Sequence, residues 1–158
     1  METRFTGDHG NGIYGFFGDW KWLSNFQLCE TSYEGDIYPS VENAYQAAKT
    51  NDREARKPMM EKTSDDEMTE GKRARLFGRK AVLRSDWEEV KLEVMRSIVK
   101  EKFVRNEILR DALLITGDLN LYLEETNYWG DKFWGVSKGE GQNHLGKILM
   151  QVRSELRK

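Results

Sequence analysis

Four side chains suited to bond-breaking chemistry recur at helical spacing within residues 39–49, "PSVENAYQAAK". At positions i, i+3, i+4 and i+7 they would put an acid, a phenol, an amide and an amine on one stripe of a helix, namely Glu42, Tyr45, Gln46 and Lys49. A neighbouring stripe of small apolar residues could face the core: Val41, Ala44 and Ala48. The polar stripe could line a pocket. Taken alone, however, this helix favours the simpler interpretation of a solvated face.

A second stretch, "NYWGDKFWG" at 127–135, surrounds one acid with large aromatic residues. Aromatic faces such as that of Trp134 stack on bases or on sugar C–H surfaces. The carboxylate of Asp131 could stabilise positive charge or activate water beside them. Gly135 would let the backbone approach a ligand closely. A binding site is at least as good an interpretation as an aromatic cluster that closes the core, with Asp131 as a turn residue.

Residues 71–84, "GKRARLFGRKAVLR", carry six cations and no acid. Arginine is suited to bidentate contact with phosphate oxygens, so this segment is a candidate phosphate site, with Arg73 and Arg79 as the proposed contacts. A charged helix face balanced by acids elsewhere explains the pattern equally well.

The glycine-rich segment 135–146, "GVSKGEGQNHLG", precedes an apolar periodic stretch. Backbone N–H groups at the start of a helix can receive an anion. A single glycine-rich turn is weak support for such a site, so an ordinary connection is the favoured interpretation here.

The elements that must position these residues can be read from local patterns. Short strands and turns are expected over 1–38, and short exposed helices over 51–70. Ser40 is the expected N-cap of the helix that carries Glu42. Ser85 and Glu88 form a capping-box arrangement at the start of a helix over 85–103.

Towards the C-terminus, the patterns predict two more helices and a strand. A helix over 106–116 should stop at Gly117, and "LNLYL" at 119–123 alternates as a strand does. Asn143 could cap a last helix whose inner face carries Leu145, Ile148, Leu149, Val152 and Leu156. The fold class expected is α+β, a single compact domain over residues 1–158, mostly helical with a small sheet.

Composition narrows the class of protein. The chain has 158 residues, with 25 Lys and Arg against 27 Asp and Glu, so its net charge of −2 argues against a protein that coats nucleic acid or anionic membrane. No apolar run is long enough for a membrane span, and the first ten residues lack the apolar core of a secretory signal. The single cysteine, Cys29, and the two histidines, His9 and His144, show no metal-ligand spacing. We expect a cytoplasmic protein without a metal.

Several motifs, in order from about Gly15 to Arg153, resemble the YbiA-like or NADAR (NAD and ADP-ribose) superfamily. They are "WLSNF" (22–26), "PSVENAYQAAK" (39–49), "GRKAVLRSDW" (78–87), "KF" (102–103), "ETNYWGDKFWGV" (125–136) and "GQNHLGKILMQVR" (141–153). The resemblance implies a compact α+β domain with N-glycosidase activity. Family members cleave the bond between a ribose phosphate and a base-like amine. Some act on early riboflavin-pathway intermediates such as phosphoribosylaminopyrimidines, and others remove ADP-ribose from guanine.

The resemblance also implies roles for individual residues. The catalytic candidates it implies are Glu42, Lys49 and Asp131, and the substrate-binding candidates it implies are Trp87 and Trp134. The further substrate-binding candidates are Asn25, Arg73, Arg79, Gly135 and Asn143. Asn43 stands where the family usually has His, and the loop that holds Asp131 is the longer variant. No metal or redox cofactor is implied.

Cleavage of an N-glycosidic bond builds positive charge on C1′ and the ring oxygen, which a nearby carboxylate stabilises. Glu42 or Asp131 could take this role, and the other could protonate the leaving amine. Lys49 could hold the phosphate, orient Glu42, or attack C1′ as a neutral amine and form a Schiff base.

Three other interpretations remain open at this point. The substrate could be ADP-ribosylated guanine in nucleic acid rather than a free metabolite. The protein could bind ADP-ribose or a nucleotide without catalysis, although a binder needs no paired carboxylates. It could also be a scaffold in which Trp87 and Trp134 are core residues.

Overall fold

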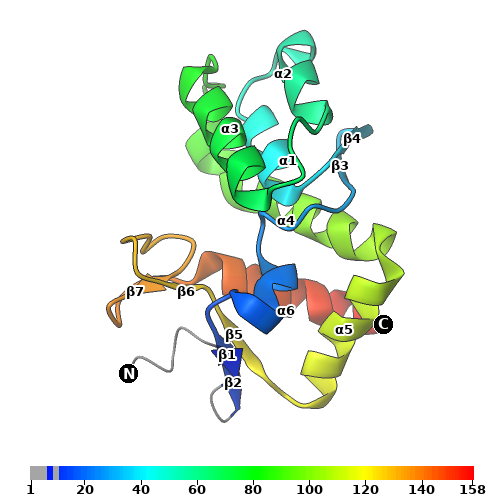
Figure 1. Cartoon of the computed structure of the whole chain (residues 1–158), viewed down its shortest axis with the longest axis vertical. Coiled ribbons are helices and arrows are strands. Elements are labelled where there is room, and N and C mark those ends of the chain that lie inside the picture. Colours follow the sequence, from blue (N-terminus) through cyan, green and yellow to red (C-terminus); the bar gives the residue numbers. More distant parts are fainter. Residues whose placement is uncertain (1–6, 9–10) are drawn as a thin grey trace. The chain divides into compact units, whose positions relative to one another are not determined.

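The computed structural model describes residues 7–8 and 11–158, in which helices predominate over short strands (Figure 1). This confirms the α+β class expected from the sequence. By their internal contacts the residues group into two units. We call Asn25–Asn106 the central unit, and Met1–Ser24 with Glu107–Lys158 the terminal unit.

The central unit consists of a β-hairpin followed by four helices. Its elements are β3 (Thr31–Tyr33), β4 (Asp36–Tyr38), α1 (Val41–Ala47), α2 (Arg53–Met60), α3 (Glu67–Lys80) and α4 (Trp87–Arg105). The strands β3 and β4 pair antiparallel. Helix α1 packs against α2, α3 and α4, while β3 lies on α4. Because other elements surround α1, the short helix is buried along its whole length.

Close approach of α1 to α3 depends on small residues along one stripe of α3. Gly71, Ala74 and Gly78 are all buried there. A Cβ added to Gly78 would lie 1.8 Å from Oε1 of Gln46 on α1, and one added to Gly71 would lie 2.3 Å from the ring of Phe26. Small residues on this stripe therefore set the distance at which the α1 side chains meet α3.

The terminal unit combines two small sheets with two long helices. Its elements are β1 (Gly7–Asp8), β2 (Gly12–Tyr14), the 3₁₀ helix η2 (Gly18–Leu23), α5 (Glu107–Asp118), β5 (Tyr122–Glu124), β6 (Thr126–Asn127), β7 (Val136–Ser137) and α6 (His144–Arg157). One sheet has the order β1-β2-β5, with β2 parallel to β5, and β6 pairs parallel with β7. Helix α6 packs on β5 and α5. Its predicted inner face is buried except for Leu156, which is half-buried.

Two predicted helix ends are wrong for identifiable reasons. Helix α4 begins at Trp87 with Asp86 in the N-cap position, so the capping box of Ser85 and Glu88 does not form. Helix α5 runs through Gly117 to Asp118. A Cβ on Gly117 would lie 3.1 Å from Cδ of Arg153, so this glycine makes room for a neighbouring side chain instead of ending the helix.

Most residues of the segment 51–70 are exposed, as predicted, but Glu70 at its end belongs to a buried polar network. Glu70 is 1% exposed and accepts hydrogen bonds from Asn43 Nδ2 (2.9 Å), from the Thr63 N–H and hydroxyl (both 3.1 Å) and from Arg73 Nη2 (2.6 Å). Burial by itself raises the pKa of the Glu70 carboxyl, but these donors outweigh it and lower that pKa to about 2. Asn43 thus holds a structural position where the resembling family usually has His.

We expect Glu70→Gln to destabilise the protein by about 3 kcal/mol at neutral pH. Lowering the pKa of the Glu70 carboxyl from 4.5 to about 2 on folding corresponds to roughly that free energy. The folded-state pKa lies below the unfolded one, so this stability is present above about pH 4.5 and disappears as the pH falls towards 2. Urea unfolding of both proteins between pH 7 and pH 3 measures it, with the exposed Glu61→Gln as matched control. If the free energy of unfolding varied with pH in the same way for wild type and Glu70→Gln, the stabilising role of the ionised Glu70 carboxylate would be contradicted.

Candidate active site

The residues proposed from the sequence fall into two groups, one in each unit. The central unit holds Asn25, Glu42, Lys49, Arg73, Arg79 and Trp87, and the terminal unit holds Asp131, Trp134, Gly135 and Asn143.

Helix α1 places the first group. Ser40 is its N-cap as predicted, because Ser40 Oγ accepts a hydrogen bond from the Asn43 N–H at 3.0 Å. Asn25 also contacts the first turn, since its carbonyl accepts from the Glu42 N–H at 3.0 Å, while its Nδ2 lies 3.6 Å from Met95 Sδ. Glu42 and Gln46 are both 6% exposed, so the interpretation of this stripe as a solvated face is wrong.

The carboxylate of Glu42 is held by two neighbours. Gln46 Nε2 donates to Glu42 Oε2 at 2.8 Å, and Arg75 Nε lies 3.5 Å from the same oxygen. The other amide atom of Gln46, Oε1, is buried without a hydrogen-bond partner and points at Gly78, where an added Cβ would lie 1.8 Å away. Gln46 is therefore confined between Glu42 and the backbone of α3, which fixes the direction of the carboxylate.

Lys49 brings an amine next to this carboxylate and an aromatic wall. Its Nζ lies 5.8 Å from the centroid of the Tyr45 ring, which in turn packs on Trp87 at 5.1 Å. Burial lowers the pKa of Lys49, the cations of Arg75, Arg79 and Lys91 lower it further, and Glu42 partly opposes them. A larger share of this amine is therefore neutral than for an exposed lysine, which suits a nucleophile.

Arg73 does not join this group. Its Nη2 donates to Glu70 and to the Glu61 carbonyl (2.7 Å), and its Nη1 donates to the Pro58 carbonyl (3.2 Å). These contacts fasten α3 to the end of α2, so its guanidinium is committed to the fold. The predicted phosphate contact at Arg73 is therefore not supported.

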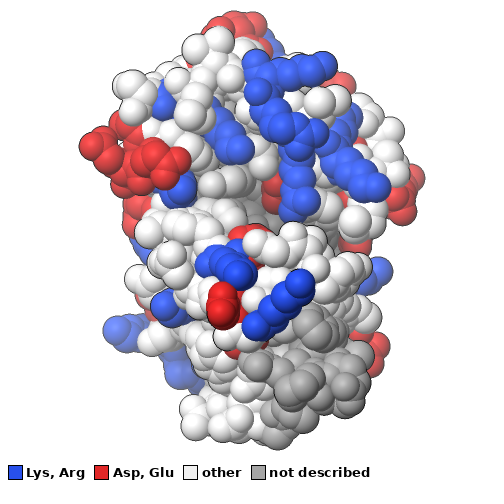
Figure 2. All heavy atoms as spheres, turned by 90° about the vertical axis from the view of Figure 1, so that its left-hand side faces the viewer, with Lys and Arg blue, Asp and Glu red and all other residues white. Residues whose placement is uncertain are grey.

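The cations beside Glu42 and Lys49 come from the next turns of α3. Arg75 is about half exposed and lies over the Phe26 ring at 4.7 Å. Arg79 is exposed and makes no ion pair or hydrogen bond with any residue that the structure describes. Figure 2 shows Lys and Arg side chains gathered over the part of the surface to which α3 contributes. Arg75 and Arg79 are therefore the arginines of this segment placed to meet an anion near Lys49.

In the terminal unit, Asp131 organises the loop between β6 and β7. Its Oδ1 accepts hydrogen bonds from the N–H groups of Phe133 (3.1 Å) and Trp134 (3.0 Å). Its backbone exchanges two further hydrogen bonds with the side chain of Asn127. Oδ1 of Asp131 therefore stabilises the turn, as one of the two interpretations of the sequence expected. Oδ2 takes part in none of these hydrogen bonds. The ring of Trp134 packs edge-on against Phe133 at 4.8 Å.

Gly135 and Asn143 serve the fold of this loop. A Cβ on Gly135 would lie 2.1 Å from the Glu125 carbonyl, so the missing side chain admits the neighbouring chain instead of a ligand. Asn143 is 2% exposed; it accepts from the Glu125 N–H at 2.9 Å and donates to the Leu123 carbonyl at 3.0 Å and to Tyr122. The substrate-binding roles proposed for both residues are therefore not supported.

The start of α6 is likewise occupied by protein groups. The N–H groups of His144 and Leu145 donate to the carbonyls of Phe133 and Trp134, at 3.2 and 2.9 Å. Because loop carbonyls already accept these hydrogen bonds, the glycine-rich segment 135–146 is an ordinary connection and not an anion site.

We expect Asn143→Gly to lower stability by about 2–4 kcal/mol, because it removes one buried and two partly buried hydrogen bonds. Glycine is the appropriate replacement, since Asn143 has φ of 53°, a left-handed conformation that other side chains adopt with strain. Thermal unfolding measures the loss, and the folded fraction should keep wild-type turnover. Unchanged stability with lost substrate binding would restore the role in substrate binding.

No helix in the described part of the chain is both long and apolar enough to cross a membrane. Among the same residues, no three His, Cys, Asp or Glu side chains gather as a metal site would require. His9 lies outside the described residues.

A family model described as the NADAR domain matches residues 5–157. N-glycosidase YbiA of Escherichia coli (strain K12) is 33% identical over 146 residues, which cover 91% of this chain and 86% of that protein. A riboflavin biosynthesis protein of Vibrio vulnificus (strain YJ016) is 38% identical over 135 residues, or 85% of this chain. The matched region spans only 35% of the Vibrio protein, so that relative is far longer.

The fold is similar to that of a solved structure over almost its whole length. The NMR structure of E. coli YbiA matches with a TM-score of 0.75 and 30% identity, covering 98% of this chain and 90% of that one. Both units are included in this match, as they are in the family model.

Proposed function

The chain belongs to the NADAR domain family, and on that premise we propose that it is an N-glycosidase that cleaves ribose phosphate from a base-like amine. Relatives named N-glycosidase and riboflavin biosynthesis protein support phosphoribosylaminopyrimidines as the substrate class. The observation that carries the proposal is the buried Glu42 carboxylate, oriented by Gln46 and near enough for its charge to act on the amine of Lys49.

Glu42 is assigned the stabilisation of the oxocarbenium-like transition state. As the N–C1′ bond breaks, positive charge develops on C1′ and the ring oxygen, and a preoriented carboxylate in a water-poor position stabilises it. The single hydrogen bond from Gln46 occupies Oε2. Oε1 is not part of that bond and is the oxygen assigned to face the sugar.

Lys49 is assigned the role of nucleophile. Its Nζ lone pair attacks C1′ as the bond to the leaving amine breaks, and the proton that Nζ then releases passes to the leaving nitrogen. Opening of the ribose ring then gives a Schiff base between C1′ and Nζ, which water hydrolyses to release the sugar phosphate. The lowered pKa of Lys49 supports this role over that of a permanently charged phosphate ligand.

The phosphate is assigned to Arg75 and Arg79. Both belong to the segment identified as basic in the sequence, and both act on the charge state of Lys49. Guanidinium groups bind phosphate oxygens bidentately, and these two do not hold the fold together as Arg73 does.

Mass spectrometry of products tests the proposal. Wild type should release ribose 5-phosphate from a phosphoribosylaminopyrimidine, and Glu42→Gln should lose at least about a hundredfold in rate. The comparison variant is Asp131→Asn, which keeps the Oδ1 acceptor that the loop requires while removing the charge. A loss confined to Asp131→Asn would transfer the carboxylate role to Asp131. Binding of ADP-ribose without turnover of any substrate would contradict the enzyme assignment.

A second candidate substrate, ADP-ribosylated guanine in nucleic acid, is favoured by the cations exposed along α3: Lys72, Arg75, Arg79 and Lys80. A polyanion extending from the site would meet this face. Release of ADP-ribose from a modified guanosine oligonucleotide, with no release of ribose 5-phosphate from the aminopyrimidine, would select this candidate.

A further inference from the structure

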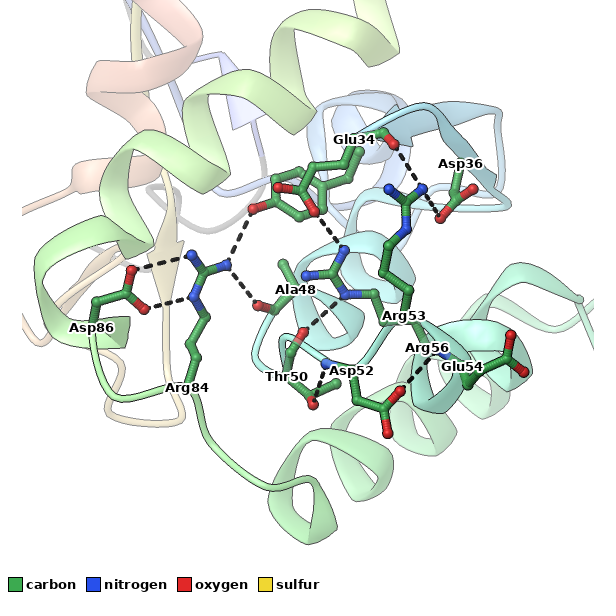
Figure 3. Close-up of polar contacts among 11 residues, drawn as sticks. Glu34, Asp36, Ala48, Thr50, Asp52, Arg53, Glu54, Arg56, Arg84 and Asp86 are labelled. Carbon is green, nitrogen blue, oxygen red and sulfur yellow. Dashed lines mark hydrogen bonds and ion pairs between the residues drawn. The ribbon is translucent and has the colours of Figure 1, made fainter.

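The end of α1, where Lys49 lies, is held by two arginines from outside the helix. Arg84 Nη1 donates to the Ala48 carbonyl at 3.3 Å, and the Arg84 N–H donates to the Lys49 carbonyl at 2.7 Å. Arg56 Nε donates to the Thr50 carbonyl at 2.9 Å. Figure 3 shows both guanidinium groups reaching this turn from different elements. The carbonyls at the end of a helix lack partners within it, so these donors fix the backbone from which the Lys49 side chain starts.

Arg84 connects the same turn to the helix that carries Trp87. The Trp87 N–H donates to the Arg84 carbonyl at 3.2 Å. The Arg84 side chain is 12% exposed, and it also donates to the Tyr33 hydroxyl at 3.2 Å. One residue thus joins the backbone of Lys49, the start of α4 and strand β3.

Asp86 completes the arrangement at the expense of a helix cap. It occupies the N-cap position of α4, where an aspartate ordinarily accepts a hydrogen bond from the first turn, yet its side chain makes no such bond. Both carboxylate oxygens instead accept from Arg84, at 2.7 and 3.2 Å. The bidentate pair sets the plane of the guanidinium, and with it the direction of the bond to Ala48.

We propose that Arg84 is a positioning residue of this hydrolase, oriented by Asp86, which holds the end of α1 so that the Lys49 amine stays against the Tyr45 ring. The proposal rests on the function assigned to Lys49 above. Arg84 acts through the backbone of Ala48 and Lys49 and touches no substrate.

Loosening this contact changes a property of Lys49 that can be measured. Burial is the largest cause of the lowered pKa of this amine, and the charged groups that act on it are Glu42 on α1, Arg75 and Arg79 on α3, and Lys91 on α4. An end of α1 that moves more freely lets the amine reach solvent. The burial contribution then falls, and the pKa of Lys49 rises towards its ordinary value.

The test compares Arg84→Gln, Asp86→Asn and their combination with wild type. The matched control is Arg53→Gln, which removes an arginine of the same unit that is 57% exposed and paired with Asp36. The pH dependence of reductive methylation of Lys49, followed by peptide mass spectrometry, reports the titration of this amine without any substrate. Turnover is measured in parallel, and circular dichroism establishes that each variant is folded.

We expect the Lys49 titration to move to higher pH in Arg84→Gln and in Asp86→Asn, with no larger effect in the double variant, because the two residues act as one pair. kcat should fall about tenfold or more with a smaller change in KM, and Arg53→Gln should match wild type. An unchanged Lys49 titration in folded Arg84→Gln and Asp86→Asn would overturn the proposal. A shifted titration in a protein whose wild type cleaves no N-glycoside would instead reject the proposed function and keep the positioning role.

Discussion

Gly78→Ala is expected to lower kcat about a hundredfold while leaving the protein folded and only modestly less stable than wild type. The added Cβ would lie 1.8 Å from Gln46 Oε1, so the Gln46 amide must move. That movement breaks its 2.8 Å hydrogen bond to Glu42 and releases the carboxylate from its orientation. A displacement of about 1 Å in a catalytic group costs rates of this order. Loss of this buried hydrogen bond costs about 1–3 kcal/mol, and the preference of the helix for alanine over glycine offsets up to about 1 kcal/mol of it, so the variant should stay folded.

Gly117→Ala is the matched control, because it makes the same substitution inside helix α5 against another flexible side chain. It should keep full activity. The double variant Gly78→Ala with Gln46→Ala should have the same kcat as Gln46→Ala alone, because residue 46 then carries no amide for the added Cβ to displace. Full activity in folded Gly78→Ala would show that the orientation of Glu42 by Gln46 does not matter.

Lys49→Ala and Lys49→Arg are both expected to lose at least about a thousandfold in kcat, because neither side chain can form a Schiff base. Borohydride reduction during turnover should add the mass of the reduced sugar phosphate to the wild-type peptide that contains Lys49. Both variants should lack this adduct. The measurement is single-turnover hydrolysis combined with peptide mass spectrometry.

Arginine at position 49 separates the roles that the sequence left open. It keeps the positive charge and can still bind phosphate, so activity retained in Lys49→Arg would assign Lys49 to phosphate binding. The exposed Lys57→Ala serves as control for the removal of a lysine from the central unit. Because burial and neighbouring cations lower the pKa of Lys49, the wild-type rate should rise with pH and level off below the range of an ordinary lysine.

The stripe on α1 could be predicted from the sequence, because it depends only on helical spacing and on a capping serine. The burial of this stripe could not be predicted from the sequence. Burial depends on the close approach of α3, which Gly78 permits at Gln46, and a glycine within a basic helical segment gives no sign of the partner it faces. For the same reason the sequence placed Gln46 on the stripe without showing that it holds Glu42.

Other predictions from the sequence were wrong where one side chain could make either of two sets of contacts. Arg73 and Arg75 are two positions apart in one basic segment, and only the structure shows that Arg73 is committed to Glu70 while Arg75 lies near Glu42. Ser85 was expected to cap α4, but Asp86 occupies the N-cap position and its carboxylate pairs with Arg84. Asn143 was correctly placed at the start of α6, but its side chain satisfies the strand and loop instead of capping. Such competition is decided by residues distant in sequence.

The most direct test of the central claim is a crystal structure of Glu42→Gln with an uncleaved phosphoribosylaminopyrimidine bound. The substitution keeps the shape of the side chain and removes its charge, so substrate should remain intact. The account predicts C1′ within contact of Gln at position 42 and of the Lys49 amine, with the phosphate on Arg75 and Arg79. A substrate bound away from α1, with its phosphate on other residues, would contradict it.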